Sequence, residues 1–215
     1  MSEAVAKAGR VAPALRAELP GLSLWSLLVD RGSGRSPAKV KQHLRQLSDR
    51  FAGAQAINLR HQAIPWAYRV FYRQIGLDPD EQPTPVEALA LERMKKGGFP
   101  SQSLLDDALT IAIVESRVAV RAFDADRLDG PLGIRPTLEG EALEGRRGEL
   151  PPATLVIADQ ARPVGLLFGA TADGRGVAPR SKRTMLCAIG VAGVPEIAVE
   201  EAIWLAAGIL RGVDG

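Results

Sequence analysis

The spacing of apolar residues changes along the chain and predicts helices in some stretches and strands in others. Apolar positions recur at helical intervals over residues 36–51, 64–96 and 195–210. An Ala-rich stretch predicts one more helix over residues 2–18. Short apolar and β-branched runs predict strands at 22–29, 110–114, 118–123, 155–159, 164–168 and 184–191. The pattern predicts an α+β fold with a β-sandwich-like core, flanking helices and a helical N-terminal extension.

The stretch from Ile64 to Gly98 reads as a helix, a proline-marked turn and a second helix. The first helix should end at Gly76, because glycine tolerates the positive φ found after helix ends. Thr84–Glu87 forms a capping box with proline at the first helical position, which starts the second helix. Arg69 and Arg73 lie four residues apart on one face, where they either contact RNA or are solvated. The apolar face should consist of Trp66, Val70, Phe71 and Ile75.

The composition is that of an ordinary globular protein. Of its 215 residues, 46% are hydrophobic, which is enough for a sizeable core. We expect an extension over residues 1–60 packed on a domain over residues 61–215. The formal net charge of +2 permits an RNA partner without requiring one. No DNA partner is expected, since bulk DNA binders are usually far more basic.

The residues that commonly bind metals are scarce. A single cysteine, Cys187, excludes an intramolecular disulfide and a Cys-based zinc site. Two histidines, His43 and His61, are too few for a His-rich metal site, so neither metal nor cofactor is expected. No apolar run reaches membrane-spanning length, and the N-terminus lacks the apolar region of a secretory signal. These features favour a cytoplasmic protein with no membrane partner.

The segment from Gly169 to Arg183 is rich in glycine and basic residues and lies between two predicted strands. Loops of this composition bring backbone N–H groups and guanidinium groups to phosphates. The same composition also fits a flexible, solvated hairpin loop. Composition alone leaves both interpretations open.

Several short motifs occur in the order and at the spacing of one known family. They are AYR at 67–69, FYR at 71–73, GLDP at 76–79, PTPVEAL at 83–89, KGG at 96–98, AFD at 122–124 and LVIAD at 155–159. Over about Ala63 to Leu210 the chain resembles the B3/B4 domain of the phenylalanyl-tRNA synthetase β-subunit, and more closely the free-standing proteins built from that domain. In the synthetase this domain edits, by hydrolysing the ester that joins a wrong amino acid to tRNA.

The resemblance implies which residues surround the site. The implied catalytic residues are Asp107, Thr110 and Glu115. The implied substrate pocket contains Arg121, Asp124 and Ser181. The implied tRNA-binding residues are Arg69, Arg73, Arg175, Arg180, Lys182 and Arg183. Two positions depart from the synthetase pattern, since Thr110 replaces an Asn and Arg121 replaces the pocket His. A Glu of the synthetase pocket is also lost at Arg180, whereas Pro179–Lys182 fits the free-standing proteins.

Several of these residues have a structural explanation beside the functional one. Asp107 could cap a helix or a turn, because carboxylates accept hydrogen bonds from free N–H groups there. Glu115 could pair with Arg117, and Arg121 could be a solvated strand residue. The sequence does not choose between the two explanations.

The resemblance implies a trans-editing hydrolase that removes the amino acid from a mischarged tRNA. No Ser-His-Asp triad is visible, and Cys187 lies mid-strand, so hydrolysis by a positioned water is expected. The free-standing relatives resemble deacylases of canavanyl-tRNA for arginine, and acidic residues would suit its guanidino-type side chain. The alternatives are a non-catalytic tRNA- or RNA-binding module and an amino-acid-binding protein that kept the pocket.

Overall fold

The structure, a computed structural model, describes residues 5–51 and 58–212. Its strands are β1 (Lys7–Ala8), β2 (Arg10–Val11), β3 (Ser23–Val29), β4 (Ala119–Asp124), β5 (Gly133–Pro136), β6 (Leu155–Ala158), β7 (Pro163–Leu166) and β8 (Thr184–Gly190). Its helices are α1 (Pro13–Glu18), α2 (Ala38–Arg50), α4 (Ala63–Gln74), α5 (Pro85–Lys96), α6 (Leu104–Ser116) and α7 (Glu196–Arg211), with the 3-10 turns η1 (Leu59–His61) and η2 (Ala125–Arg127).

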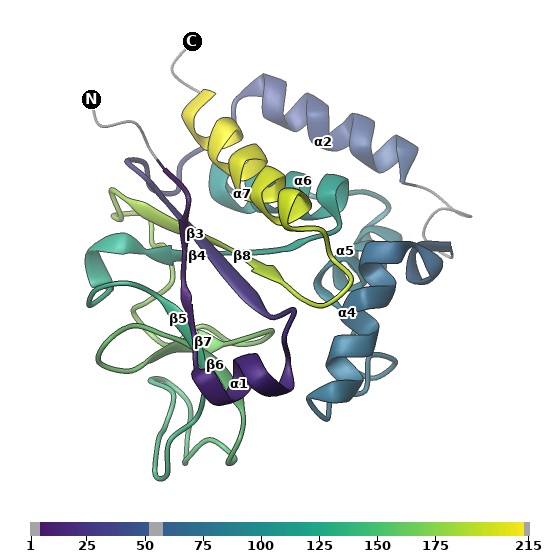
Figure 1. Ribbon diagram of the computed structural model, residues 1–215. Coiled ribbons are helices and arrows are strands. Elements are labelled where there is room, and N and C mark those ends of the chain that lie inside the picture. The colour runs from purple at the N-terminus through teal and green to yellow at the C-terminus, as the bar shows by residue number, and fades with distance from the viewer. Residues whose placement is uncertain (1–4, 52–57, 213–215) are drawn as a thin grey trace.

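Two four-stranded sheets pack face to face, and helices cover the outer face of one of them (Figure 1). The first sheet has the order β1-β3-β8-β4 and the second has the order β2-β5-β6-β7. Helices α2, α6 and α7 lie over the first sheet, whereas α4 and α5 lie beside the two sheets (Figure 1). The predicted α+β class with a sandwich-like core is confirmed.

The side chains of strand β8 contribute alternately to two different hydrophobic cores. Leu186 and Ala188 point into the core that the first sheet shares with α2, α6 and α7. Cys187 and Ile189 point into the core between the two sheets, beside Phe123. Successive side chains of a strand face opposite sides, so a continuous apolar run indicates a strand that is buried on both faces.

The N-terminal segment joins the two sheets. Lys7 pairs with Ser26 of the first sheet, whereas Arg10 pairs with Gly133 of the second. Between them, the Gly9 N–H donates to the Leu24 carbonyl at 2.7 Å. The predicted helix over residues 2–18 is therefore wrong for residues 7–11, which form ladder hydrogen bonds with strands that sequence periodicity cannot reveal. Helix begins only at Pro13, and residues 1–4 lie outside the described part of the chain.

A second correction concerns residues 110–114, which were predicted as a strand and lie inside helix α6. The helix begins at the N-cap Ser103, whose hydroxyl accepts a hydrogen bond from the Asp106 N–H at 3.2 Å. Its apolar side chains are buried on several sides, between the first sheet and helices α2 and α7. A helix buried in this way shows little amphipathic spacing, so its short apolar run resembles a strand.

The helix pair α4–α5 is confirmed, with one difference in its apolar face. Gly76 follows α4 with φ of +77°, and the Thr84 N–H donates to Glu87 Oε2 at 3.1 Å in the expected capping box. Trp66 and Val70, however, are 49% and 38% exposed. The buried face consists of Pro65, Ala67, Tyr68, Arg69, Phe71 and Tyr72.

The hydrogen bonds of the Tyr68 hydroxyl help to fix which face of α4 is buried. It donates to the Ile189 carbonyl of β8 and accepts from the Ala119 N–H of β4 at 3.1 Å, so α4 is fastened to the first sheet. Burial raises the pKa of the Tyr68 phenol well above its ordinary value, so the group stays a donor.

Across the described ranges, no helix combines the length and the apolar character that crossing a membrane would require.

Candidate functional site

The end of β4 and the loop of residues 169–183 are held together by side-chain contacts. Asp124 Oδ2 accepts a hydrogen bond from the Ser181 hydroxyl at 2.5 Å, and Asp124 Oδ1 accepts from the Asp126 N–H at 3.0 Å. The Ser181 hydroxyl oxygen in turn accepts from the Ala178 N–H at 2.9 Å. Asp124 is only 7% exposed, so these contacts fix the tip of the loop against a buried carboxylate. We call this group the Asp124 cluster.

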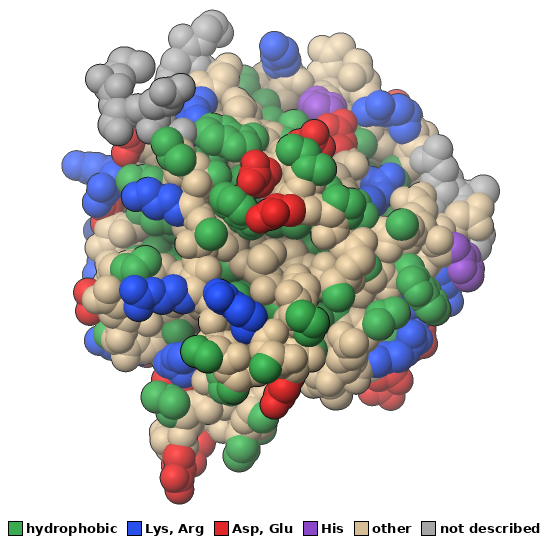
Figure 2. Space-filling model, viewed as in Figure 1, with side chains coloured by type: hydrophobic (Ala, Val, Ile, Leu, Met, Phe, Trp, Pro, Cys, Tyr) green, Lys and Arg blue, Asp and Glu red, His purple; other side chains and the backbone are tan. Residues whose placement is uncertain are grey.

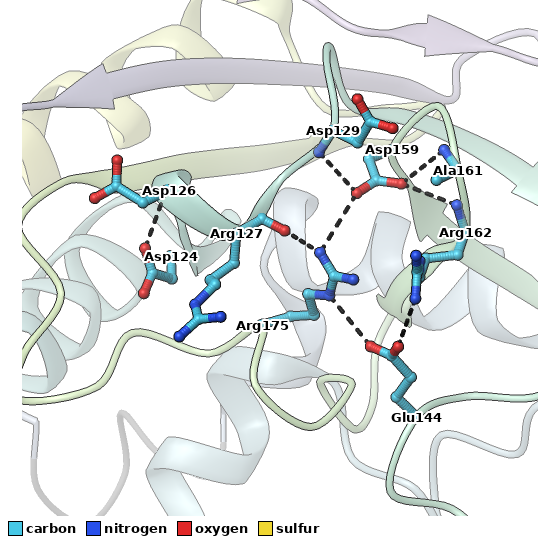
Figure 3. Close-up of polar contacts among 9 residues, drawn as sticks. All are labelled: Asp124, Asp126, Arg127, Asp129, Glu144, Asp159, Ala161, Arg162 and Arg175. Carbon is cyan, nitrogen blue, oxygen red and sulfur yellow. Dashed lines mark hydrogen bonds and ion pairs between the residues drawn. The ribbon is translucent and has the colours of Figure 1, made fainter.

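Arg175 fastens the middle of the same loop (Figure 3). Its guanidinium donates to the Arg127 carbonyl and to Glu144 at 3.2 Å, and it lies 3.9 Å from the buried carboxylate of Asp159. Hydrogen bonds from Arg162 and Arg175 hold the pKa of Glu144 below its ordinary range. Because its donors are engaged by other groups of the protein and its side chain is only 15% exposed, Arg175 positions the loop and offers little of its charge to solvent.

Two cations of this loop are presented to solvent. Arg180 and Lys182 are exposed on either side of Ser181 and, within the described part of the chain, make no ion pair or side-chain hydrogen bond. Arg183 is half-exposed and pairs with Asp126 at 2.5 Å, and this pairing raises the pKa of the Arg183 guanidinium. The loop thus offers two unpaired positive charges beside the Asp124 cluster.

Arg127 adds a third cation that the sequence analysis did not identify. It ends η2, three residues after Asp124, and its side chain makes no contact with the other residues drawn in Figure 3. The available signal was its place three residues after the end of the AFD motif at 122–124. The structure was needed to show that the chain turns here and brings Arg127 toward the basic loop.

Asp107 lies at the start of α6 and is almost fully buried. Its carboxylate accepts from the Ser36 and Ser101 hydroxyls at 2.5 and 2.6 Å and from the Gln102 N–H at 3.0 Å. These bonds tie α6 to the segment after β3. That segment also reaches the basic loop, because Gly32 packs on the Ser181 backbone. Asp107 and the Asp124 cluster are thus linked through one short segment.

Glu115 lies at the opposite end of α6. It follows Asp107 by eight positions, which correspond to about 12 Å of helix. Its carboxylate is 2.9 Å from His43 Nε2 and 3.5 Å from Arg50 Nη2, so it pairs with α2. Thr110 follows Asp107 by one turn on the same face of α6. Asp107 is therefore connected to the Asp124 cluster through residues 32–36, whereas Glu115 lies at the far end of α6.

Arg121 closes the edge of the sandwich formed by β4 and β7. Its guanidinium donates to the carbonyls of Leu166, Leu167 and Gly169 and to the Thr171 hydroxyl, the last two at 2.9 Å. Burial lowers the pKa of Arg121 to about 10, so the group remains charged at neutral pH. All four acceptors belong to β7 and the turn after it.

The two arginines of α4 differ in their surroundings. Arg69 is 5% exposed and pairs with Asp80 at 2.5 Å and with Glu87 at 2.9 Å. These hydrogen bonds raise the pKa of its guanidinium despite the opposing effect of burial. Arg73 is half-exposed, 3.9 Å from Asp80, and stacks on the Trp66 ring. Only Arg73 presents its charge to solvent.

The remaining chemistry-bearing groups are few. Cys187 is fully buried between the sheets, and burial raises the pKa of its thiol to about 12. Within residues 5–51 and 58–212, no three acidic, His or Cys side chains are grouped as a metal site would need. Figure 2 shows Lys and Arg side chains on one face interspersed with acidic and apolar ones. Positive charge is therefore local, as in the loop around Ser181.

Comparison with known proteins gives a consistent result. Residues 67–198 match the family described as the B3/4 domain. Over 94 residues the chain is 39% identical to the phenylalanine–tRNA ligase β subunit of Xanthomonas oryzae pv. oryzae strain MAFF 311018, a match that covers 42% of this chain and 12% of that subunit. The corresponding subunits of Xanthomonas euvesicatoria pv. vesicatoria and Xylella fastidiosa strain Temecula1 are 38% and 37% identical over the same shares. Since the family match covers more than half of its residues, the chain belongs to the B3/4 domain family.

Proposed function

We propose that the chain hydrolyses the ester of a mischarged aminoacyl-tRNA, acting in trans, with the Asp124 cluster and the basic loop as its site. The observation that carries this proposal is the pairing of a buried carboxylate with two unpaired cations on a fixed loop. Asp124 holds Ser181, and Arg180 and Lys182 flank Ser181 in the chain. The related β subunits are named as tRNA ligases, and this supports tRNA as the partner.

The loop suits the RNA end of such a substrate. A phosphate is attracted by exposed cations, and the attraction is strongest when the cations need no reordering on binding. Arg175 and Ser181 already fasten the loop at two points, so Arg180 and Lys182 are displayed from a fixed backbone. Arg127, whose carbonyl accepts from Arg175 of the same loop, is a third exposed cation. We assign these three residues to the tRNA backbone.

The carboxylate of Asp124 suits the reacting end. Each of its oxygens accepts one hydrogen bond from the protein, which leaves lone pairs for a further donor. We assign Asp124 the role of orienting the attacking water and accepting its proton. The water oxygen forms a bond to the ester carbonyl carbon, the bond from that carbon to the ribose oxygen breaks, and the ribose oxygen takes up a proton. Positioning supplies most of the acceleration, because the ester is already activated.

Asp107 and Thr110 are proposed as supports of the site, since the buried Asp107 carboxylate already accepts three hydrogen bonds. Asp126 is already paired with Arg183, but the Asp124 carboxylate lies at the reacting end without an ion-pair partner in the described ranges, and its negative charge favours a substrate with a cationic side chain. A guanidino-type amino acid such as canavanine, attached to arginine tRNA, is the candidate substrate.

One observation favours a second function, a tRNA-binding module without catalysis. Arg121 stands where the resemblance places the pocket His, and its donors are engaged by β7 and the following turn. A substrate cannot use these donors unless the turn opens. If no other group replaces that His, the protein binds the RNA end without hydrolysing the ester.

The deciding experiment measures loss of the ester from a panel of charged tRNAs. Each tRNA carries its cognate amino acid or a near analogue, with canavanyl-tRNA for arginine and tyrosyl-tRNA for phenylalanine included. If the protein is an editing enzyme, we expect one mischarged tRNA to lose its amino acid rapidly while the correctly charged tRNA is spared. Salt-sensitive tRNA binding without hydrolysis of any species would instead establish the binding module.

Variants then locate the site. Asp124→Asn keeps an acceptor for Ser181 and should lower the hydrolysis rate by about 10²-fold or more, as expected for loss of a proton acceptor. Asp49→Asn is the matched control, because it makes the same change at an exposed position of α2. Equal activity of the wild type and Asp124→Asn would remove Asp124 from the chemistry.

A further inference from the structure

A groove of about 820 Å³ lies where the N-terminal segment meets the second sheet. One wall comes from β2 and α1, and the other from the strands β5 and β6 and the residues that flank them. Figure 1 shows α1 beside β5 and β6. The first wall precedes residues 67–198, which match the family, whereas the second wall lies within them, so the groove forms where the N-terminal segment meets the shared domain.

The charges of this groove are unbalanced. Arg10 and Arg16 line one wall, are exposed, and within the described ranges have no ion-pair or side-chain hydrogen-bond partner. On the other wall, Arg135 is neutralised by a two-point pair with Glu141 at 2.5 and 2.6 Å. The Asp159 side chain is fully buried, accepts from three backbone N–H groups and lies 3.9 Å from Arg175, so its carboxylate is not exposed in the groove.

The local structure explains why both arginines face the groove. Val11 is buried between the sheets, and successive residues of a strand point to opposite sides, so Arg10 points outward. Within α1, Leu15 is buried in the same core, whereas Pro13, Arg16 and Ala17 share the helix face that lines the groove. The segment 10–17 thus contributes two cations to the surface and two apolar anchors to the core.

The rest of the groove can hold a base and a ribose. Exposed apolar side chains such as Pro13, Ala17 and Pro131 line it, and the exposed Gln160 contributes an amide that can both donate and accept. Its volume lies toward the upper end of the range of about 300–1,000 Å³ found for ligand sites, which is more than one phosphate ion needs. Unpaired arginines, an apolar lining and an amide together match a short RNA strand.

We propose that this groove binds a single-stranded segment of the RNA partner, with Arg10 and Arg16 on its phosphates. The proposal rests on the proposed function in that both take tRNA as the partner. Asp159 connects the two regions, since its backbone lines the groove while its carboxylate lies 3.9 Å from Arg175 of the basic loop. One RNA end can therefore contact both the groove and the loop.

The test compares binding of an uncharged tRNA and of a short single-stranded RNA oligonucleotide to purified variants. Arg10→Ala with Arg16→Ala should weaken both affinities at least fivefold and lower the salt dependence by about two released ions. Lys39→Ala with Arg45→Ala removes the same charge from exposed positions of α2 and should leave binding unchanged. Ala17→Glu, which places a carboxylate in the groove, should weaken binding without removing any arginine.

The outcomes separate the two proposals. Wild-type affinity in both groove variants, alongside weaker binding after Arg180→Ala with Lys182→Ala, would overturn the groove and leave the proposed function standing. Weaker binding in the groove variants without hydrolysis by the wild type would support the groove and refute the enzyme. Binding of neither RNA by the wild type would refute both. Thermal unfolding of each variant identifies any loss caused by misfolding.

Discussion

Arg121 is a partly buried cation whose partners are acceptors of β7 and its following turn, with no carboxylate within ion-pair distance in the described ranges. Replacing it by Met would leave several of these acceptors without a donor at a partly buried sheet edge. We predict that Arg121→Met lowers the free energy of unfolding by about 2–3 kcal/mol, measured by urea titration. Arg121→Lys should retain part of the stability. An unchanged midpoint in Arg121→Met would show that the sandwich edge closes without it.

Cys187 is buried on β8, and its raised pKa keeps the thiol protonated at neutral pH. We predict that a thiol reagent modifies the urea-unfolded protein rapidly. It should modify the native protein only at the rate at which the fold around Cys187 opens. The Cys187→Ala variant should hydrolyse or bind its substrate as the wild type does. Rapid labelling of the native protein, or loss of activity in Cys187→Ala, would reopen a thiol mechanism.

Glu141 forms a two-point pair with Arg135, and this hydrogen bonding holds its pKa below the ordinary value near 4.5. Since the folded protein binds the proton less readily than the unfolded chain, the pair stabilises the fold fully above the ordinary pKa. That stability is lost as the pH falls through the lower pKa of the folded state. We predict that Glu141→Gln is less stable than the wild type at pH 7 and that the difference shrinks toward pH 3. Parallel urea titrations across this range would reveal a constant difference if the pair contributes nothing.

Among the elements, the N-terminal strands depend on a close approach at Gly9. A Cβ at this position would lie 2.8 Å from the Leu132 carbonyl oxygen and 2.9 Å from Leu24 Cδ2. We predict that Gly9→Ala lowers the free energy of unfolding by about 1–3 kcal/mol, because backbone must move to admit the methyl group. Gly34→Ala is the matched control, since a Cβ there meets nothing within 4 Å. Equal stability of the two variants would contradict the tight crossing between the sheets.

The elements that the sequence predicted correctly are those whose signals are local. The capping box at Thr84 and the helix end at Gly76 depend on a few neighbouring residues, and both are present. The strand character of residues 7–11 depends on partners at Ser26 and Gly133, which no local pattern encodes. Helix α6 was predicted in part as a strand because tertiary burial removes the amphipathic spacing that identifies a helix.

The candidate site, too, was predicted only in part from the sequence. The resemblance identified Asp124 and Ser181, but their contact spans 57 residues of sequence and appears only in the fold. It likewise could not show that Arg175 is engaged inside the protein whereas Arg180 and Lys182 are unpaired. Arg10, Arg16 and Arg127 were not singled out, because none belongs to a motif of the family. Exposure and pairing are properties of three-dimensional packing.

At the scale of the whole molecule, the features that suit an RNA end lie along connected segments. The segment after β3 links Asp107 to Ser181, and the polar contacts of Figure 3 link the basic loop to the strand end that lines the groove. A formal net charge of +2 means that binding depends on these local cations and not on a general positive field. Binding and hydrolysis should therefore respond to a few substitutions at this end of the molecule.

The most direct measurement is the rate of ester loss from a mischarged tRNA, with wild-type protein and with Asp124→Asn in parallel. We predict that the wild type accelerates hydrolysis of one mischarged species and spares the cognate, and that Asp124→Asn lowers this rate by about 10²-fold or more. If every charged tRNA loses its amino acid only at the spontaneous rate in the presence of the wild type, this prediction is wrong.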